Sequence, residues 1–337
     1  MSDSVPEKPT RRPRYRGRNP RHFSEKYKEH DPERYADDVA KVLASGKTPA
    51  GTHRPIMVEE VLAALAPKPG QLVVDCTLGY GGHARELLAA IQPGGRLFGL
   101  DVDPIELPKT EARLRALGYG PETFTAIRTN FAGLVKVLPG PADAILADLG
   151  LSSMQIDNPA RGFTFKHDGP LDLRFNPNRG QPASALLAGL DEQALAALLA
   201  ANADEPNASS LARAILRAQA RCPLMRTLEF VDVIRATGAE DDAVRRTFQA
   251  LRIAVNDEFS ALETFLRNLP CCLKPGGRVA ILAFHSGEDR RVKKAFQTGE
   301  REGTYRQIVR EVVRPTSAEM RANPRASSAK LRWAERA

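Results

Sequence analysis

Residues 71–83, Q-L-V-V-D-C-T-L-G-Y-G-G-H, carry the clearest indication of the fold. Residues 72–74 form a short apolar run typical of a buried parallel strand, and Asp75 closes it. Three glycines follow within four positions, and a helical pattern begins near Ala84. Because glycine lets the backbone turn sharply and approach a ligand closely, the stretch predicts the first strand, turn and helix of a nucleotide-type α/β sheet.

The spacing of these glycines indicates what kind of ligand the turn could hold. The dinucleotide fingerprint G-x-G-x-x-G supports a pyrophosphate on a helix N-terminus, whereas this turn has the pattern D-x-x-x-G-x-G-G. An acid before the glycines suits a ligand with a cationic end and no phosphates, and S-adenosylmethionine is the common ligand of that kind. A tight turn that binds no ligand is the alternative for this stretch alone.

Acids also close later strands of the predicted sheet. The second and fourth strands end in Asp101 and Asp148. Asp101 lies 22 residues after Gly79, where an acid usually accepts hydrogen bonds from ribose hydroxyls. Ligands in open α/β sheets bind beyond the carboxyl ends of the strands, so we expect Asp75, Asp101 and Asp148 to converge in one crevice.

The rest of the chain predicts a sheet that is interrupted by helices. Apolar runs place further strands at residues 96–101, 123–129, 143–148, 278–284, 307–313 and 329–334. Residues 149–175 are irregular, and helical patterns then cover 183–269, with one helix over 184–201 and one long amphipathic helix from about residue 242. We therefore expect three parts, namely a basic arm at 1–52, a core formed by 53–154 and 256–337, and an inserted all-helical substrate domain at 155–255.

The charge balance makes nucleic acid a candidate partner. The chain has 49 basic and 41 acidic residues, a net charge of +8, with the surplus concentrated near the two ends. Residues 11–21 hold six arginines and no acid. This segment is either a solvated tail or an arm that lies on a phosphate backbone, and a short helix is predicted over 27–43.

The four cysteines, Cys76, Cys222, Cys271 and Cys272, have no metal-ligand or redox spacing, so we expect no metal site and a reducing compartment. No apolar run reaches membrane-spanning length, and the chain opens without a signal peptide. The expected location is the cytoplasm, with no membrane partner. The sequence leaves open whether the chain forms a homo-oligomer.

Eight segments of the chain closely resemble the MraW/RsmH family of S-adenosylmethionine-dependent methyltransferases, which act on N4 of a cytidine in 16S ribosomal RNA. The matching motifs are H-R-P-I-M (53–57), D-C-T-L-G-Y-G-G-H (75–83), D-L-G-L-S-S-M-Q-I-D (148–157), R-G-F-T-F (161–165), D-G-P-L-D-L-R (168–174), T-F-Q-A-L-R-I-A-V-N-D-E (247–258), F-H-S-G-E-D-R-R-V-K (284–293) and N-P-R-A-S-S-A-K-L-R (323–332). The chain departs from the family pattern at Gly287 and at residues 204–206.

The resemblance implies a class I (Rossmann-like) fold with a seven-stranded, mostly parallel sheet and an inserted helical domain. It also implies methyl transfer to a cytidine in the decoding region of the small ribosomal subunit RNA. The implied contacts to S-adenosylmethionine are Gly81, Gly82, His83, Asp101, Phe131, Asp148 and Gln155. From the residues alone, Phe131 could pack either on adenine or in the core.

Methylating an exocyclic amine requires positioning and a hydrogen-bond acceptor, because the nitrogen lone pair is delocalised into the ring. Asp148 or a nearby backbone carbonyl is the candidate acceptor, and no cysteine intermediate is required. We expect residues 149–175 and the helical insert to form the base pocket. The candidate lining residues are Arg161, Phe163, Asp172 and Arg174, for which salt bridges and packing that stabilise the loop are the alternative.

Other functions are weighed against this one. A DNA amino-methyltransferase normally carries an Asn/Asp/Ser-Pro-Pro-aromatic motif after the fourth strand, where this chain has D-L-G-L (148–151). The glycine spacing disfavours a nicotinamide dehydrogenase, and His285–Ser286 lacks the nucleophile elbow of a hydrolase. The alternative that stays open is a non-catalytic RNA-binding or ribosome-assembly protein on a methyltransferase fold.

Overall fold

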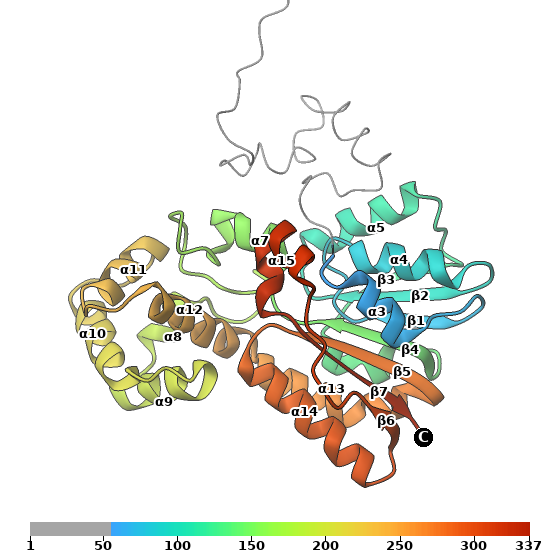
Figure 1. Cartoon of the computed structure of the whole chain (residues 1–337). Helices are drawn as coiled ribbons and strands as arrows, with labels where there is room; N and C mark the ends of the chain where they lie inside the picture. Colours follow the sequence, from blue (N-terminus) through green and yellow to red (C-terminus); the bar gives the residue numbers. More distant parts are fainter. Residues whose placement is uncertain (1–54) are drawn as a thin grey trace, which may run out of the picture. The chain divides into compact units, whose positions relative to one another are not determined.

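The computed structural model describes residues 55–337, which form one compact unit (Figure 1). The predicted arm at 1–52, the predicted helix over 27–43 and His53 lie outside the described residues. In the described part, no helix combines the length and apolar character needed to cross a membrane.

The centre of the described unit is one seven-stranded sheet with the order β3-β2-β1-β4-β5-β7-β6. All neighbouring strands pair in parallel except β7, which runs antiparallel to β5 and β6. The strands are β1 (Leu72–Asp75), β2 (Arg96–Asp101), β3 (Phe124–Arg128), β4 (Ala142–Asp148), β5 (Leu273–Ala283), β6 (Tyr305–Ile308) and β7 (Lys330–Arg336). The predicted seven-stranded, mostly parallel sheet is confirmed.

Helices cover both faces of the sheet and form a three-layer α/β/α core (Figure 1). One face carries α3 (Val58–Leu65), α4 (Gly82–Ile91) and α5 (Glu106–Ala116), and the other carries α6 (Leu134–Val137), α13 (Glu258–Cys272) and α14 (Ser286–Arg301). In α4 the buried stripe Leu87, Leu88 and Ile91 is fully inaccessible. Burying each of these side chains contributes about 1.5–3 kcal/mol, so packing rather than helix propensity holds the layers together.

The register of the central strands brings the strand-closing acids to one edge. Asp75 of β1 pairs with Gly99 of β2 and with Leu146 of β4. Asp101 and Asp148 each lie two residues further along their own strands. Because parallel strands present their carboxyl ends on the same side, all three acids lie along that edge.

A separate group of helices has a hydrophobic core of its own, beside the sheet in Figure 1. These helices are α8 (Ala183–Ala188), α9 (Glu192–Ala203), α10 (Ala208–Arg221), α11 (Thr227–Arg235) and α12 (Asp241–Asn256). We refer to α8–α12 as the helical layer. The single helix predicted over 184–201 is wrong, because Asp191 accepts a 2.7 Å hydrogen bond from the Ala194 amide and so caps a new helix, α9.

The long amphipathic helix predicted from about residue 242 to 269 is also wrong. Asp257 adopts a left-handed backbone, with φ at +51°, and separates α12 from α13. Both helices bury an apolar face, so the apolar spacing continues across the break and does not reveal it. Across this break the Arg252 guanidinium makes a two-pronged ion pair with Glu258, at 2.8 and 2.9 Å.

Shorter elements lie between the main ones. The irregular region contains α7 (Ser153–Asp157) and the 3-10 turn η3 (Pro159–Arg161), and the 3-10 turn η2 (Phe131–Gly133) follows β3. Near the C-terminus, α15 (Ser317–Ala322) and η4 (Pro324–Ser328) precede β7. The last three strands begin or end some residues away from their predicted bounds. For example, β5 starts at Leu273 and contains a bulge at K-P-G-G before it pairs regularly with β4.

Candidate functional site

The glycine turn between β1 and α4 is pinned against α5. Gly81 has a φ of +83°, which favours glycine, and a Cβ added there would lie 2.8 Å from Cγ2 of Thr110. The Thr110 hydroxyl donates a 2.5 Å hydrogen bond to the carbonyl oxygen of Gly79. Glycine at position 81 therefore lets α5 approach and fix the shape of the turn.

Gly82 is required by packing on a different side. A Cβ at this position would lie 2.6 Å from Cγ of Pro55, in the segment that leads into α3. The third glycine of the motif thus has a structural reason that involves no ligand. Its predicted contact with the cofactor stays a prediction.

Asp101, at the end of β2, is engaged through both carboxylate oxygens. Oδ2 accepts a 2.8 Å hydrogen bond from the Gly79 amide, and Oδ1 accepts a 2.9 Å bond from the Asp103 amide. Burial raises the pKa of Asp101, and these two amides act in the opposite direction. Each oxygen keeps a second lone pair, so the carboxylate could still accept hydrogen bonds from ribose hydroxyls.

Asp75, at the end of β1, is fully buried next to the same turn. Its pKa is raised to about 6, chiefly because burial penalises the charged form, while His83 and the Thr77 amide lower it. The carboxylates of Asp148 and Asp101 contribute to the increase in the pKa of Asp75 to a smaller extent. Their predicted convergence at one edge agrees with these interactions.

His83 and Asp148 form a pair across the edge of the sheet. Nε2 of His83, in the first turn of α4, lies 3.5 Å from Oδ2 of Asp148 at the end of β4. Burial lowers the pKa of His83, but the Asp148 carboxylate outweighs this, and the net pKa is raised. The other oxygen of Asp148, Oδ1, is buried and has no hydrogen-bond partner among the described residues. An unpartnered acceptor at this place is free to bind a donor.

Phe131 lies in η2, beyond β3, and is half-buried. Its ring packs edge to face on Phe265 of α13, with the ring centroids 5.3 Å apart. One side of the ring is therefore committed to the core. A stacking contact between its remaining surface and an adenine stays a prediction.

Gln155 is held entirely by protein groups. In the capping box at the start of α7, its amide donates to the Ser152 hydroxyl and its Oε1 accepts from the Ser152 amide. Its Nε2 donates a 2.9 Å hydrogen bond to Oδ2 of Asp103. The sequence analysis does not identify Asp103. The signal that could have found it is D-V-D-P (101–104), because an acid before Pro often caps a helix.

Arg161 and Phe163, two of the four residues expected to line the base pocket, are both buried. The Arg161 guanidinium lies 2.7 Å from Oδ2 of Asp103. The Phe163 ring packs on the Phe175 ring, with the two ring centroids 6.0 Å apart. These contacts match the alternative given for these residues, in which a salt bridge and packing stabilise the loop. Contact of either side chain with a substrate base stays a prediction.

Asp172 and Arg174 make a two-pronged pair with each other, at 2.8 and 2.7 Å, and both side chains are partly exposed. Burial raises the pKa of Asp172, but the hydrogen bonds and charge of Arg174 outweigh it, so the pKa is lowered. Asp172 is therefore an anion at neutral pH. Of the four candidates, these two are the ones that solvent reaches most readily.

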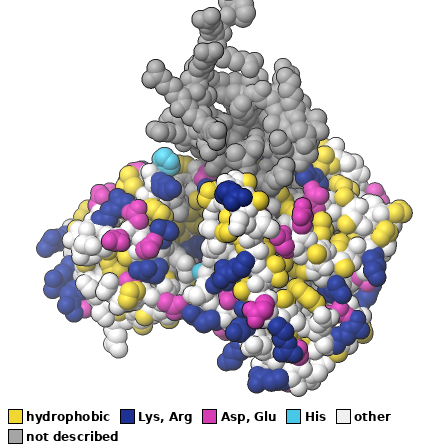
Figure 2. All heavy atoms as spheres, viewed as in Figure 1, with side chains coloured by type: hydrophobic (Ala, Val, Ile, Leu, Met, Phe, Trp, Pro, Cys, Tyr) yellow, Lys and Arg dark blue, Asp and Glu magenta, His cyan; other side chains and the backbone are white. Residues whose placement is uncertain are grey.

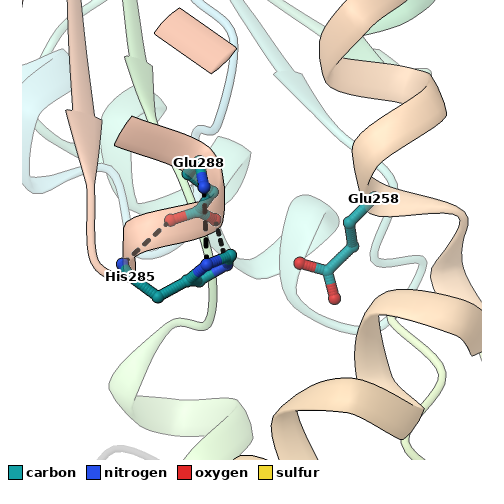
Figure 3. Close-up of side chains that lie close together, drawn as sticks. All are labelled: Glu258, His285 and Glu288. Atoms are coloured by element: carbon teal, nitrogen blue, oxygen red, sulfur yellow. Dashed lines mark hydrogen bonds and ion pairs between the residues drawn. The ribbon is translucent and has the colours of Figure 1, made fainter. Parts of the chain in front are cut away.

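A second cluster of ionisable groups lies just beyond β5. Ligand atoms of Glu258, His285 and Glu288 lie within 4.8 Å of one another, and in Figure 3 the Glu258 carboxylate faces the His285 ring from the neighbouring helix. Both carboxylates already have partners, since Arg252 holds Glu258 and the Phe284 amide donates to Glu288 at 2.8 Å. The Arg252 guanidinium supplies positive charge next to this cluster, and the expectation of no metal stays a prediction.

The fold and the acid-lined edge together define the class of protein. The protein is a methyltransferase of class I. The features that define this class are the glycine turn between β1 and α4, the acids at the ends of β1, β2 and β4, and the antiparallel β7. The chain belongs to the MraW methylase family, whose model matches residues 50–337.

Curated relatives are similar over almost the whole chain. The ribosomal RNA small subunit methyltransferase H 2 of Alkaliphilus metalliredigens is 50% identical over 99% of this chain and 100% of its own length. The corresponding methyltransferase H 1 of Lachnoclostridium phytofermentans is 48% identical over 97% of this chain and 93% of its own. Among solved structures, fibrillarin of Aeropyrum pernix with natively bound S-adenosyl-L-methionine matches with a TM-score of 0.37 and 12% identity, covering 82% of this chain and 74% of that one.

Proposed function

We propose that the protein transfers the methyl group of S-adenosylmethionine to N4 of one cytidine in the decoding region of 16S ribosomal RNA. The observation that carries this proposal is the arrangement of Asp75, Asp101 and Asp148 at one edge of the sheet, with a free acceptor on Asp148. The names of the curated relatives support ribosomal RNA as the substrate. With such a substrate, we expect the protein to act in the cytoplasm.

The site fits S-adenosylmethionine by its charge. Three carboxylates around a glycine turn favour a cationic sulfonium ligand and disfavour a pyrophosphate. When bound, the cofactor supplies an electrophilic methyl group. The residues proposed to hold it are Gly81, Gly82, His83, Asp101, Phe131, Asp148 and Gln155.

Asp148 has the proposed catalytic role. Oδ1 of Asp148 would accept a hydrogen bond from the N–H of N4, stabilise the positive charge that develops there, and take the proton that N4 must lose. His83 lies next to the other oxygen, with Nε2 3.5 Å from Oδ2. Orienting the amine toward the methyl group supplies much of the rate enhancement, up to about 7–11 kcal/mol.

The target cytidine must leave its stack to reach this edge. We propose that residues 155–255 act as the substrate domain on a methyltransferase core formed by 53–154 and 256–337. Arg161 and Phe163 shape the pocket from within, and Asp172 and Arg174 are its accessible residues.

Phosphate contacts would come from basic side chains on the surface. Figure 2 shows Lys and Arg gathered over α14 and along the outer helices of the helical layer, where Lys293, Lys294, Arg217 and Arg221 are exposed. Such side chains bind RNA by charge without reading its sequence.

The test is methyl transfer from labelled S-adenosylmethionine to small ribosomal subunits that lack the modification, followed by nucleoside analysis. We expect N4-methylated cytidine at a single position. Cofactor binding without any incorporation would instead support the non-catalytic RNA-binding or assembly protein. Label on another nucleoside would contradict the proposed target atom.

A further inference from the structure

A buried hydrogen-bond network that centres on Asp103 joins two parts of the site that the sequence treats separately. Oδ2 of Asp103 accepts from Nε2 of Gln155 at 2.9 Å and from the Arg161 guanidinium at 2.7 Å. All three side chains are buried. Oδ1 of the same carboxylate accepts from the Ile105 amide, so the position of Asp103 is fixed by the start of α5 as well.

On one side, Asp103 is connected to the glycine turn. Its amide donates a 2.9 Å hydrogen bond to Oδ1 of Asp101, whose Oδ2 accepts from the Gly79 amide at 2.8 Å. The backbone of the proposed cofactor site and the Asp103 carboxylate are therefore joined by one continuous chain of hydrogen bonds.

On the other side, Arg161 carries the network to residues 171–175, which we call the substrate loop. Its second guanidinium nitrogen donates to the carbonyl oxygens of Phe175 and Arg174, at 2.9 and 3.2 Å. Asn256, the last residue of α12, holds the same loop by accepting from the Phe175 amide and donating to the Leu173 carbonyl, both at 2.7 Å. The loop is thus held from two directions.

The substrate loop is strained where these two residues hold it. Leu173 has a φ of +64°, a left-handed conformation that a branched side chain rarely adopts. Such a conformation persists only when the surroundings over-determine it. Leu173 lies between Asp172 and Arg174, so its strained backbone sets the directions in which these two paired side chains leave the loop.

We propose that Asp103 is a positioning residue that couples the cofactor site to the substrate loop through Arg161. Cofactor binding at the glycine turn holds Asp101 and Asp103, which hold Arg161, which in turn holds the loop in the conformation that receives the RNA. The coupling rests on the proposed function, because it needs both a cofactor and an RNA substrate. By linkage it is reciprocal, so RNA bound at the loop raises the affinity for the cofactor by the same factor.

The first test is hydrogen exchange on the unmodified chain with S-adenosylhomocysteine as the probe. We expect this ligand, without RNA, to slow exchange of the backbone amides of residues 171–175, while amides in α10 serve as the internal control. Binding of the ligand with unchanged exchange in the loop would overturn the coupling. Failure of the ligand to bind would instead contradict the proposed function.

The second test separates coupling from a merely structural role. Arg161→Lys keeps a cation beside Asp103 but loses the fork that reaches the loop carbonyls. Arg226→Lys is the matched control, because Arg226 pairs with Asp168 near the same loop but is half exposed and outside the network.

The measured quantity is the affinity for S-adenosylhomocysteine with and without unmodified small subunits. In the wild type and in R226K we expect the RNA to raise the affinity, within the range of about 5–150-fold usual for coupled sites. In R161K we expect this ratio to fall to about one at small-subunit concentrations that saturate the variant, with its binding of the subunits measured separately. An unchanged ratio in R161K would refute the coupling, and the hydrogen-exchange result decides it if R161K does not fold.

Discussion

Nε2 of His83 lies 3.5 Å from Oδ2 of Asp148, which joins the first turn of α4 to the end of β4. The two residues are 65 positions apart in the chain, and only the parallel pairing of β1 with β4 brings them together. Nε2 of His83 and Oδ1 of Asp148 are both buried and have no hydrogen-bond partner among the described residues, so one donor and one acceptor remain available at this edge. The first prediction depends on this acceptor.

Asp148→Asn removes the charge of the acceptor while keeping its shape. We expect kcat to fall about 10²–10³-fold, the usual loss for one pre-organised electrostatic contact. The measurement is single-turnover methyl transfer at saturating cofactor and RNA. The matched control is Asp143→Asn on the same strand, whose carboxylate pairs with Lys274 at the opposite end of β4 and should leave kcat nearly unchanged. Full turnover by D148N would show that the acceptor lies elsewhere.

Asp75 makes stability depend on pH, because burial raises its pKa from 3.8 to about 6. Between these values the folded state holds a proton that the unfolded state has released, so this contribution to stability is present at low pH and is lost as the pH rises through 6. Asp75→Asn does not ionise and keeps the oxygen that accepts from the Thr77 amide. Relative to the wild type, D75N should therefore become more stable as the pH is raised from 4 to 8.

The gain is on the order of 3 kcal/mol, since each pKa unit corresponds to about 1.4 kcal/mol. The measurement is the free energy of urea unfolding of both proteins at several pH values. Asp143→Asn is again the control. If the difference between D75N and the wild type is the same at every pH, Asp75 does not carry the raised pKa.

Gly81→Ala should destabilise the protein for two reasons that a matched control can separate. The added Cβ costs about 1–2 kcal/mol through the positive φ and further free energy through its 2.8 Å approach to Cγ2 of Thr110. Gly118→Ala has a similar φ, +93°, with no atom within 4 Å, and should show the conformational cost alone. Urea unfolding compares the two variants.

Thr110→Ser provides the second half of that experiment. Serine keeps the hydroxyl that donates to the Gly79 carbonyl and removes the methyl group that the new Cβ would meet. We therefore expect the double variant G81A/T110S to recover part of the stability that G81A alone loses. Equal losses in G81A and G118A, with no recovery by T110S, would mean that α5 does not constrain the turn.

The ion pair between Arg252 and Glu258 should be worth far more than a surface pair on the same helix. Glu258→Gln leaves the guanidinium without its carboxylate at a site where the two side chains are only 13% and 11% exposed, and we expect a loss of about 3 kcal/mol. Glu263→Gln is the control, because Glu263 pairs with Arg291 on an exposed face of α13 and should cost at most about 1 kcal/mol. Losses of equal size in urea unfolding would contradict the structural role of the buried pair.

Much of the fold follows from local patterns. The apolar runs that end in Asp75, Asp101 and Asp148 predict three central strands, since a buried parallel strand is apolar along its whole length. The glycines at 79 and 81 indicate positive φ angles, which the turn shows. The break at Asp257 was missed because α12 and α13 keep the same apolar spacing, and a change of helix direction leaves no trace in that spacing.

The candidate site was predictable only in part. Asp101 and Asp148 were identified because they close strands, and the register places them at one edge. For Arg161 the sequence predicts either a lining residue of the base pocket or a salt bridge that stabilises the loop, but it does not reveal the partner, Asp103, 58 residues earlier in the chain. Asn256 gave no signal, because an asparagine at the end of a helix is common and its contact with the loop spans 81 residues.

The βα unit at residues 71–83, the acids that close the strands and the family can all be read from the amino-acid sequence. Each of these depends on short-range features, namely backbone freedom at glycine, side-chain periodicity and local motif spacing. The tertiary structure alone decided which groups meet, including His83 with Asp148 and Asp103 with Gln155 and Arg161. These contacts depend on strand order and helix packing, which bring distant segments within hydrogen-bond distance and which no local pattern specifies.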